Sequence, residues 1–131
     1  MRKNLDVTVI GAGFGGIKTA LELAKERSNS IKLISDRDYF QYYPALFSTA
    51  TDSRESFVPL ADIFARHPNV TIIKDEIVSI DTSAQLLKGN GSYHYDTAVF
   101  ALGSVTTYFG IEGLDTYSYG IKSQAEILRL Q

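Results

Sequence analysis

The chain has 131 residues, of which 44% are hydrophobic, and a formal net charge of −2. This length and hydrophobic content are typical of one globular domain with an ordinary core. Lys and Arg form no stripe of the kind that binding to a phosphate backbone requires, so nucleic acid is excluded as a partner.

Cysteine is absent from the sequence, which excludes disulfides, thiolate metal sites and thiol nucleophiles within these residues. The apolar stretch after the basic start is interrupted by Asp6, so no cleavable signal peptide is predicted. Every apolar run falls short of the roughly 20 residues that a spanning helix needs. We therefore expect a soluble, cytoplasmic protein.

The first 35 residues predict a strand, a helix and a second strand. Residues 5–10 are rich in β-branched side chains and end at a glycine, as in a buried parallel strand. Apolar residues then recur every three or four positions and predict a helix over 14–27. After a break at Ser28–Ser30, residues 31–35 form the second strand of a βαβ unit.

The rest of the chain predicts further strands and short helices. Residues 36–52 read as a loop that feeds a short helical turn and contains five aromatic residues close together. We then expect a short helix over 59–66, strands over 70–74 and 76–80, a hairpin over 86–95 around Gly89–Gly91, a buried strand over 97–101 and a helical tail over 123–130. Asp75 and Glu76 are interpreted as a solvated turn and the start of a strand. The predicted class is α/β, with a parallel sheet, flanking helices and a small β-hairpin or β-meander.

A glycine pattern lies where the first strand passes into the first helix: Gly11-Ala12-Gly13-Phe14-Gly15-Gly16. Gly11 permits a tight turn, Gly13 allows the backbone to approach a pyrophosphate, and Gly16 lets the helix pack near the strand. The amides of Phe14 and Gly15, at the positive end of the helix dipole, are the predicted phosphate donors. The pattern predicts a Rossmann-like FAD/NAD(P)-binding domain; the alternative is a tight turn without a ligand.

An acidic residue is expected about 20 positions further on, where it accepts hydrogen bonds from a ribose. Asp36 occupies this place, with Ser35 beside it and Asp38 close by; the alternative for Asp36 is a solvated loop carboxylate. Arg37 suits a 2′-phosphate, but the adjacent acid would repel one. We therefore predict an unphosphorylated ribose.

Four motifs in chain order resemble the two-dinucleotide-binding flavoproteins, in particular the type II NADH:quinone oxidoreductases. The matching stretches are residues 9–16, residues 39–40 with 43–46, residues 95–104 and residues 108–113. The resemblance implies that FAD binds at the glycine pattern, with Ser35 or Asp36 at its ribose. It also implies that the backbone of Ile77 and Val78 lies along the adenine.

The resemblance further assigns the turn Ala101-Leu102-Gly103 to a close approach to the cofactor, although Leu102 stands where Thr is common. Pro44 and the aromatic residues beside it are expected near the isoalloxazine ring, with ordinary loop packing equally open. Disulfide reductases and sulfide:quinone oxidoreductases of the same superfamily use thiols. The absence of cysteine therefore favours an electron path from NADH through FAD to a quinone-like acceptor.

The expected organisation is one FAD-binding domain over residues 1–131, the N-terminal fragment of a protein whose NADH-binding domain lies beyond it. NADH and quinone would then bind outside this chain, and the full-length protein would lie peripherally on the inner face of the cell membrane. No catalytic side chain is identified. His67 and His94 have no spaced partner, so no metal site is predicted.

Two alternatives to a flavoprotein NADH dehydrogenase stay open at this point. One is a non-catalytic nucleotide-binding module, for which a homo-oligomer built through an incomplete sheet is one form. The other is part of a Rossmann dehydrogenase that uses NAD alone. The isolated chain is expected to bind FAD weakly at most and to have no NADH:quinone turnover.

Overall fold

The computed structural model describes residues 4–45, 57–118, 120 and 126. The chain divides into two compact units. The first consists of residues 1–40 and 59–103, and the second of residues 41–58 and 104–131. Each unit is described by itself.

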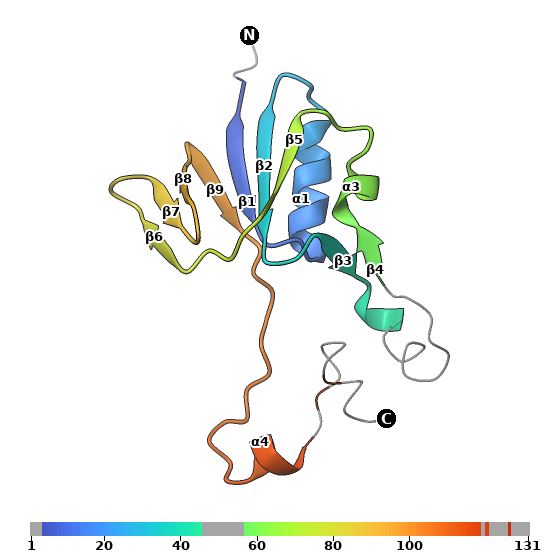
Figure 1. Ribbon diagram of the computed structural model, residues 1–131, viewed down its shortest axis with the longest axis vertical. Coiled ribbons are helices and arrows are strands. Elements are labelled where there is room, and N and C mark those ends of the chain that lie inside the picture. Colours follow the sequence, from blue (N-terminus) through green and yellow to red (C-terminus); the bar gives the residue numbers. More distant parts are fainter. Residues whose placement is uncertain (1–3, 46–56, 119, 121–125, 127–131) are drawn as a thin grey trace. The chain divides into compact units, whose positions relative to one another are not determined.

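The first unit is built on a four-stranded parallel sheet (Figure 1). Its strands lie in the order β5 (Val70–Lys74), β2 (Ser30–Ser35), β1 (Asp6–Ile10) and β9 (Thr97–Phe100). The chain passes outward from β1 to β2 and β5 and then returns to the other side of β1. This reversal places a topological switch point between the carboxyl ends of β1 and β9, where open α/β sheets bind their ligands.

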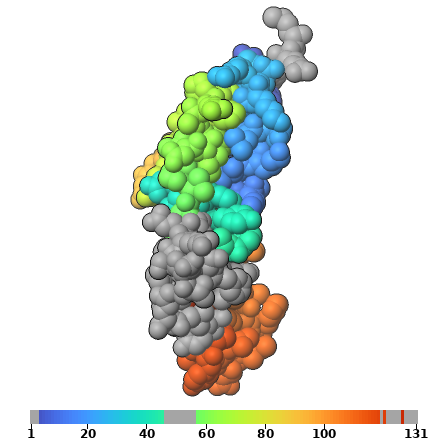
Figure 2. Space-filling view, turned by 90° about the vertical axis from the view of Figure 1, so that its right-hand side faces the viewer, coloured from blue at the N-terminus to red at the C-terminus, as the bar shows by residue number. Residues whose placement is uncertain are grey.

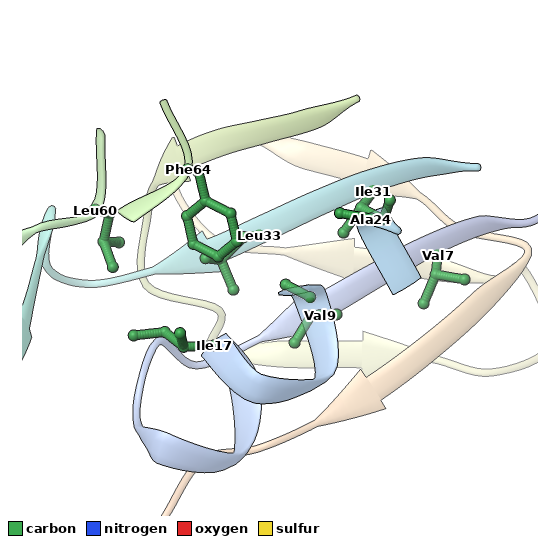
Figure 3. Packing of buried hydrophobic residues seen from close by; sticks show 9 residues of the cluster. Val7, Val9, Ile17, Ala24, Ile31, Leu33, Leu60 and Phe64 are labelled. Carbon is green, nitrogen blue, oxygen red and sulfur yellow. The ribbon is translucent and has the colours of Figure 1, made fainter. Parts of the chain in front are cut away.

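Helices cover one face of this sheet. Val9 and Leu33 point from β1 and β2 toward Ile17 of α1 (Phe14–Ala24) and toward Leu60 at the start of α3 (Leu60–Ile63) (Figure 3). The surfaces of α1 and of residues 60–74 lie side by side (Figure 2). The predicted βαβ unit is therefore present, with its apolar stripe against the sheet.

A three-stranded antiparallel sheet covers the other face. It consists of β6 (Ser79–Asp81), β7 (Leu86–Lys88) and β8 (Ser92–His94), in that order. Leu87 of β7 packs with Ile10 and Ile34 of the parallel sheet. Because alternate strand residues point to opposite faces, β1 and β2 are buried on both sides. The predicted α/β class with a small meander is confirmed.

Helix α1 ends three residues before the predicted boundary of 27. The side-chain amide of Asn29 donates to the carbonyl of Leu23 at 2.9 Å, and that of Asn69 donates to the carbonyl of Ala24 at 3.3 Å. These amides satisfy carbonyl groups that a helix end leaves without intrahelical partners. The two asparagine side chains thus supply donors that the backbone N–H groups of a further helical turn would otherwise provide.

Other boundaries also differ from the sequence prediction. The strand expected over 76–80 is shorter and starts later, since β6 begins at Ser79, and the helix expected over 59–66 is only the single turn α3. The elements not predicted are β3 (Tyr39–Gln41), β4 (Phe57–Pro59) and α4 (Leu114–Tyr117); β3 and β4 form a two-stranded sheet. The helical turn expected in the aromatic loop is the 3₁₀ helix η1 (Tyr43–Ala45). Apart from Glu126, the tail expected over 123–130 lies outside the described residues.

No helix among the described residues has the length and apolar character needed to cross a bilayer.

Asp75, which the sequence places in a solvated turn, is buried at 5% exposure. Its Oδ1 accepts the backbone N–H groups of Glu76 and Asn90 at 2.8 and 3.0 Å and the Asn90 side-chain amide at 2.9 Å. Its Oδ2 accepts the N–H of Gly91 at 2.9 Å and the hydroxyl of Tyr93 at 2.7 Å. The solvated interpretation is therefore wrong. The carboxylate, directly after β5, is hydrogen-bonded to Asn90 and Gly91 of the β7–β8 turn and connects the two segments.

The turn has a glycine where the chain meets this carboxylate. A Cβ at Gly89 would lie 2.4 Å from the carbonyl oxygen of Glu76 and 2.8 Å from each carboxylate oxygen of Asp75. These distances are shorter than any ordinary contact of a carbon atom, so a side chain at position 89 is excluded. The close approach of Glu76 and Asp75 explains why position 89 is a glycine, and no positive φ is needed for this explanation.

We predict that Asp75 makes folding stability depend on pH. The amides of Gly91 and Asn90 and the hydroxyl of Tyr93 hold the pKa of this carboxyl well below its ordinary value of 3.8. A lowered folded-state pKa stabilises the fold above the unfolded pKa, and this stabilisation is lost as the pH falls toward the folded value. Urea unfolding should show a gap in unfolding free energy between the wild-type chain and Asp75→Asn that is full near pH 7 and shrinks below about pH 4. A gap that stays constant as the pH falls would contradict this role.

Candidate functional site

The glycine turn begins directly after β1. Its first residue, Gly11, has a backbone conformation that residues with a side chain rarely adopt. Its φ is +102°, in a region that glycine adopts without strain. A Cβ at this position would also lie 2.3 Å from the carbonyl oxygen of Ala101. The Gly11 N–H donates to the carbonyl of Ile34 at 2.8 Å, which ties the turn to β2. Gly11 therefore permits the tight turn expected of it.

Gly16 brings the start of α1 against this turn. A Cβ at Gly16 would lie 1.8 Å from the carbonyl oxygen of Gly11 and 3.4 Å from the Cβ of Ala101. A Cβ at the neighbouring Gly15 would make only an ordinary contact, 3.9 Å from the Cβ of Ala101. Close packing of helix on turn therefore requires glycine at position 16.

Gly13 differs from both, because the space beside it is open. No heavy atom of the described chain lies within 4 Å of the position that a Cβ would take there. Its backbone is extended, at φ −83° and ψ −170°, which other residues adopt readily. The absence of a side chain at position 13 therefore meets no need of the described structure, and it leaves the backbone open to a close approach.

The first turn of α1 presents its amides toward this opening. Gly13 is the N-cap residue and supplies no side-chain cap, and the first turn holds no acidic residue. By helix geometry the N–H groups of Gly15 and Gly16 have no acceptor within the helix. The side chain of Phe14 is 52% exposed and meets the ring of Phe40 edge-on, with centroids 4.9 Å apart. Amides at the positive end of a helix favour an anion.

The turn after β9 lies beside the glycine turn. The Ala101 N–H donates to the carbonyl of Ile10 at 2.8 Å, so the pairing of β1 with β9 extends to this residue. Leu102 then leaves the sheet with 70% of its surface exposed, and Gly103 follows with a φ of +72° and no heavy atom of the described segments within 4 Å of a Cβ position. The segment predicted from the Ala101-Leu102-Gly103 motif thus borders the switch point.

An apolar pocket of about 190 Å³ opens at these strand ends. Val78 and Leu102 on its wall are 73% and 70% exposed. The pocket is lined by Ile10, Ile77, Val78, Ser79, Ile80, Phe100 and Leu102. Exposed apolar side chains around a hollow make this pocket a candidate site for an apolar group.

Three of the pocket residues were sequence-predicted site residues: Ile77, Val78 and Leu102. Ile10 and Phe100 were missed, although each is the last residue of a strand that flanks the switch point. Their place at the carboxyl ends of neighbouring parallel strands is the signal that would have found them.

Ser35 and Asp36 lie at the carboxyl end of β2. Ser35 is buried, and its hydroxyl donates to Oδ1 of Asp36 at 3.3 Å while accepting the N–H of Arg37 at 3.2 Å. The side chain of Asp36 is 57% exposed, and its Oδ1 also pairs with Nε of Arg37 at 3.4 Å. The exposed carboxylate is thus held in place from two sides.

Pro44 lies in η1, which belongs to the second unit. Its expected approach to an isoalloxazine ring stays a prediction. Among the described residues, no group of three or more His, Asp and Glu side chains is placed to hold a metal ion.

A parallel sheet with a switch point, a glycine turn with open space beside Gly13, and an apolar pocket at the same strand ends define a Rossmann-type dinucleotide-binding domain. The family model for the pyridine nucleotide-disulphide oxidoreductases matches residues 5–131. The chain belongs to this family of oxidoreductase enzymes, and the resemblance inferred from the motifs is confirmed.

Named relatives agree with this assignment. The type II NADH:quinone oxidoreductase of Staphylococcus haemolyticus is 33% identical over 125 residues, which are 89% of this chain and 31% of the relative. The sulfide:quinone oxidoreductase structure from Aquifex aeolicus is 34% identical, with a TM-score of 0.83 over 95% of this chain and 30% of that one. NDH2 of Plasmodium falciparum, solved with NADH, has a TM-score of 0.83 at 20% identity, covering 98% of this chain and 28% of that one, and shows the shared fold. The chain thus spans about a third of the length of these relatives.

We predict opposite outcomes for two glycines of the turn. Gly16→Ala should lower the unfolding free energy by at least about 2 kcal/mol, because the new methyl overlaps the Gly11 carbonyl. Gly13→Ala should change it by no more than about 1 kcal/mol, the scale of a weakened N-cap. Urea denaturation followed by circular dichroism measures both. Equal losses in the two variants would show that the opening at Gly13 is not present in solution.

Proposed function

We propose that this chain binds FAD and forms the FAD-binding part of a flavoprotein oxidoreductase that passes electrons from NADH to a quinone. The observation that carries the proposal is the open backbone at Gly13, facing the uncapped first turn of α1 at the switch point. A pyrophosphate needs this combination of room and donors.

Binding of the pyrophosphate is assigned to Gly11–Gly16. With no Cβ at position 13, a phosphate oxygen can approach the main chain directly. Amides of the first turn, those of Phe14 and Gly15 in our assignment, donate to it, and the helix dipole favours its charge. No side chain is needed for this step.

The ribose is assigned to Asp36, with Ser35 as the residue that orients its carboxylate. The carboxylate is exposed and able to accept hydroxyl groups, whereas Ser35 is buried. Arg37 pairs with Asp36 and lies over the Tyr39 ring, 5.9 Å from its centroid. The cation beside the carboxylate is thus already engaged, which supports an unphosphorylated ribose over a 2′-phosphate.

The adenine is assigned to the apolar pocket, with Ile77 and Val78 on one wall and Leu102 on another. A flat aromatic ring there would cover the exposed surfaces of Val78 and Leu102. Leu102 in place of the Thr common in related flavoproteins adds apolar area at this position. The Ala101-Leu102-Gly103 turn would pass close to the cofactor.

When bound, FAD supplies the hydride and electron transfer chemistry, while the residues of this chain bind and orient it. NADH and quinone appear in the name of the Staphylococcus haemolyticus relative, and quinone in that of the Aquifex aeolicus enzyme. Since the chain matches about 31% of the first of these relatives, we place the NADH and quinone sites outside residues 1–131. Pro44 is proposed to face the isoalloxazine ring.

The test is ligand titration of the purified 131-residue chain and of Gly13→Val. We expect the isolated chain to bind FAD weakly but measurably, with a shift of the flavin absorption band, and the variant to bind with an affinity at least about tenfold lower, because its side chain fills the space for the pyrophosphate. Circular dichroism should show both proteins folded, and Thr71→Val, on exposed surface of β5, is the matched control that keeps full affinity.

Three outcomes would contradict the proposal. Unchanged FAD affinity in a folded Gly13→Val chain would remove the pyrophosphate from the turn. Binding of NAD without FAD would favour an NAD-only Rossmann domain. Binding of neither would leave the glycine turn as a structural element without this ligand.

A further inference from the structure

We propose that Asp75 is the positioning residue of the adenosine side of the site: its buried carboxylate sets the course of the Ile77–Val78 wall of the apolar pocket. This inference rests on the proposed function. Asp75 touches no ligand in this account and acts through the segment that follows it.

The first observation is that Asp75 joins two edges of the site through its own backbone and side chain. Its N–H donates to the carbonyl of Ser35 at 2.9 Å, at the strand end that carries the proposed ribose carboxylate. Its carboxylate binds the turn at Asn90 and Gly91, in the antiparallel sheet. One residue thus connects β2 with the sheet that backs the pocket.

The second observation concerns residues 75–78, which lead from β5 to β6 outside any strand. The N–H of Val78 donates to the carbonyl of Lys88 at 2.9 Å. Between the end of β5 and this bond, the Asp75 carboxylate accepts the N–H of Glu76 at 2.8 Å. This hydrogen bond replaces part of the backbone pairing that would hold residues 75–78 if they formed a strand.

The third observation is the chemistry that this attachment demands. The two carboxylate oxygens of Asp75 accept five hydrogen bonds in all, four from N–H groups and one from a hydroxyl. An asparagine in its place has one acceptor oxygen, and its NH₂ group cannot accept the N–H of Gly91, so that bond has no equivalent. None of the carboxylate's partners belongs to the glycine turn at Gly11–Gly16. The effect of a substitution should therefore be confined to the adenosine side.

The test compares ADP, which carries adenosine, with inorganic pyrophosphate, which lacks it. Both are titrated into the wild-type chain and Asp75→Asn, with binding followed by NMR shifts of backbone amides. We expect ADP affinity to fall about fivefold in Asp75→Asn while pyrophosphate affinity stays within about twofold. A residue that only stabilised the fold would not separate the two ligands.

Asp81→Asn is the matched control. Oδ1 of Asp81 also accepts two backbone N–H groups, those of Ser83 and Ala84 at 3.0 and 2.9 Å, but it does so in an exposed turn. Loss of that carboxylate should leave the affinities for both ligands unchanged.

Tyr93→Phe serves as a second variant that decides the matter if Asp75→Asn does not fold. It removes a single bond to Oδ2, made at 2.7 Å, and should weaken ADP about twofold or more with pyrophosphate unaffected. Unchanged ADP affinity in the folded variants, or an equal loss for both ligands, would overturn the role of Asp75 while leaving the proposed function standing. A wild-type chain that binds neither ADP nor FAD would contradict the proposed function, and this inference with it.

Discussion

The start of α1 rests on the carbonyl of Gly11, at a separation that leaves no room for a Cβ at Gly16. Most of the site follows from this contact. It presses the first helical turn against the end of β1, beside the return strand β9, so that uncapped amides stand at the switch point of the sheet. Gly13 lies on the outer side of the same turn, where no heavy atom of the described residues comes within 4 Å of the position of a Cβ. One packing constraint thus produces both the donors and the room that a diphosphate requires.

The adenosine side depends on a different kind of interaction. Its apolar pocket is walled by a segment that leaves β5 without joining a strand until Ser79, and the buried carboxylate of Asp75 holds the first part of that segment. A buried charge is stable there because its oxygens accept five hydrogen bonds. The glycine turn and the Asp75 cluster therefore organise the two halves of the proposed site by separate means.

The sheet, α1 and the glycine turn were predictable from sequence because each depends on local needs: periodic apolar residues, a strand bounded by glycine, and glycines at close approaches. The family could be inferred for the same reason, since its motifs lie at turns. The end of α1 was not predictable, because Asn69, which caps Ala24, is 45 positions away in the chain. Asp75 looked solvated because its partners Asn90 and Tyr93 follow 15 and 18 residues later. Such long-range partners carry no periodic signal.

The most direct test of the central claim is a crystal structure of the chain with ADP. We predict that the diphosphate lies over the turn at Gly13, with its oxygens within hydrogen-bond distance, about 3 Å, of first-turn amides of α1. We also predict that the adenine lies between Val78 and Leu102. A diphosphate bound elsewhere, with the turn at Gly13 facing only solvent, would contradict it.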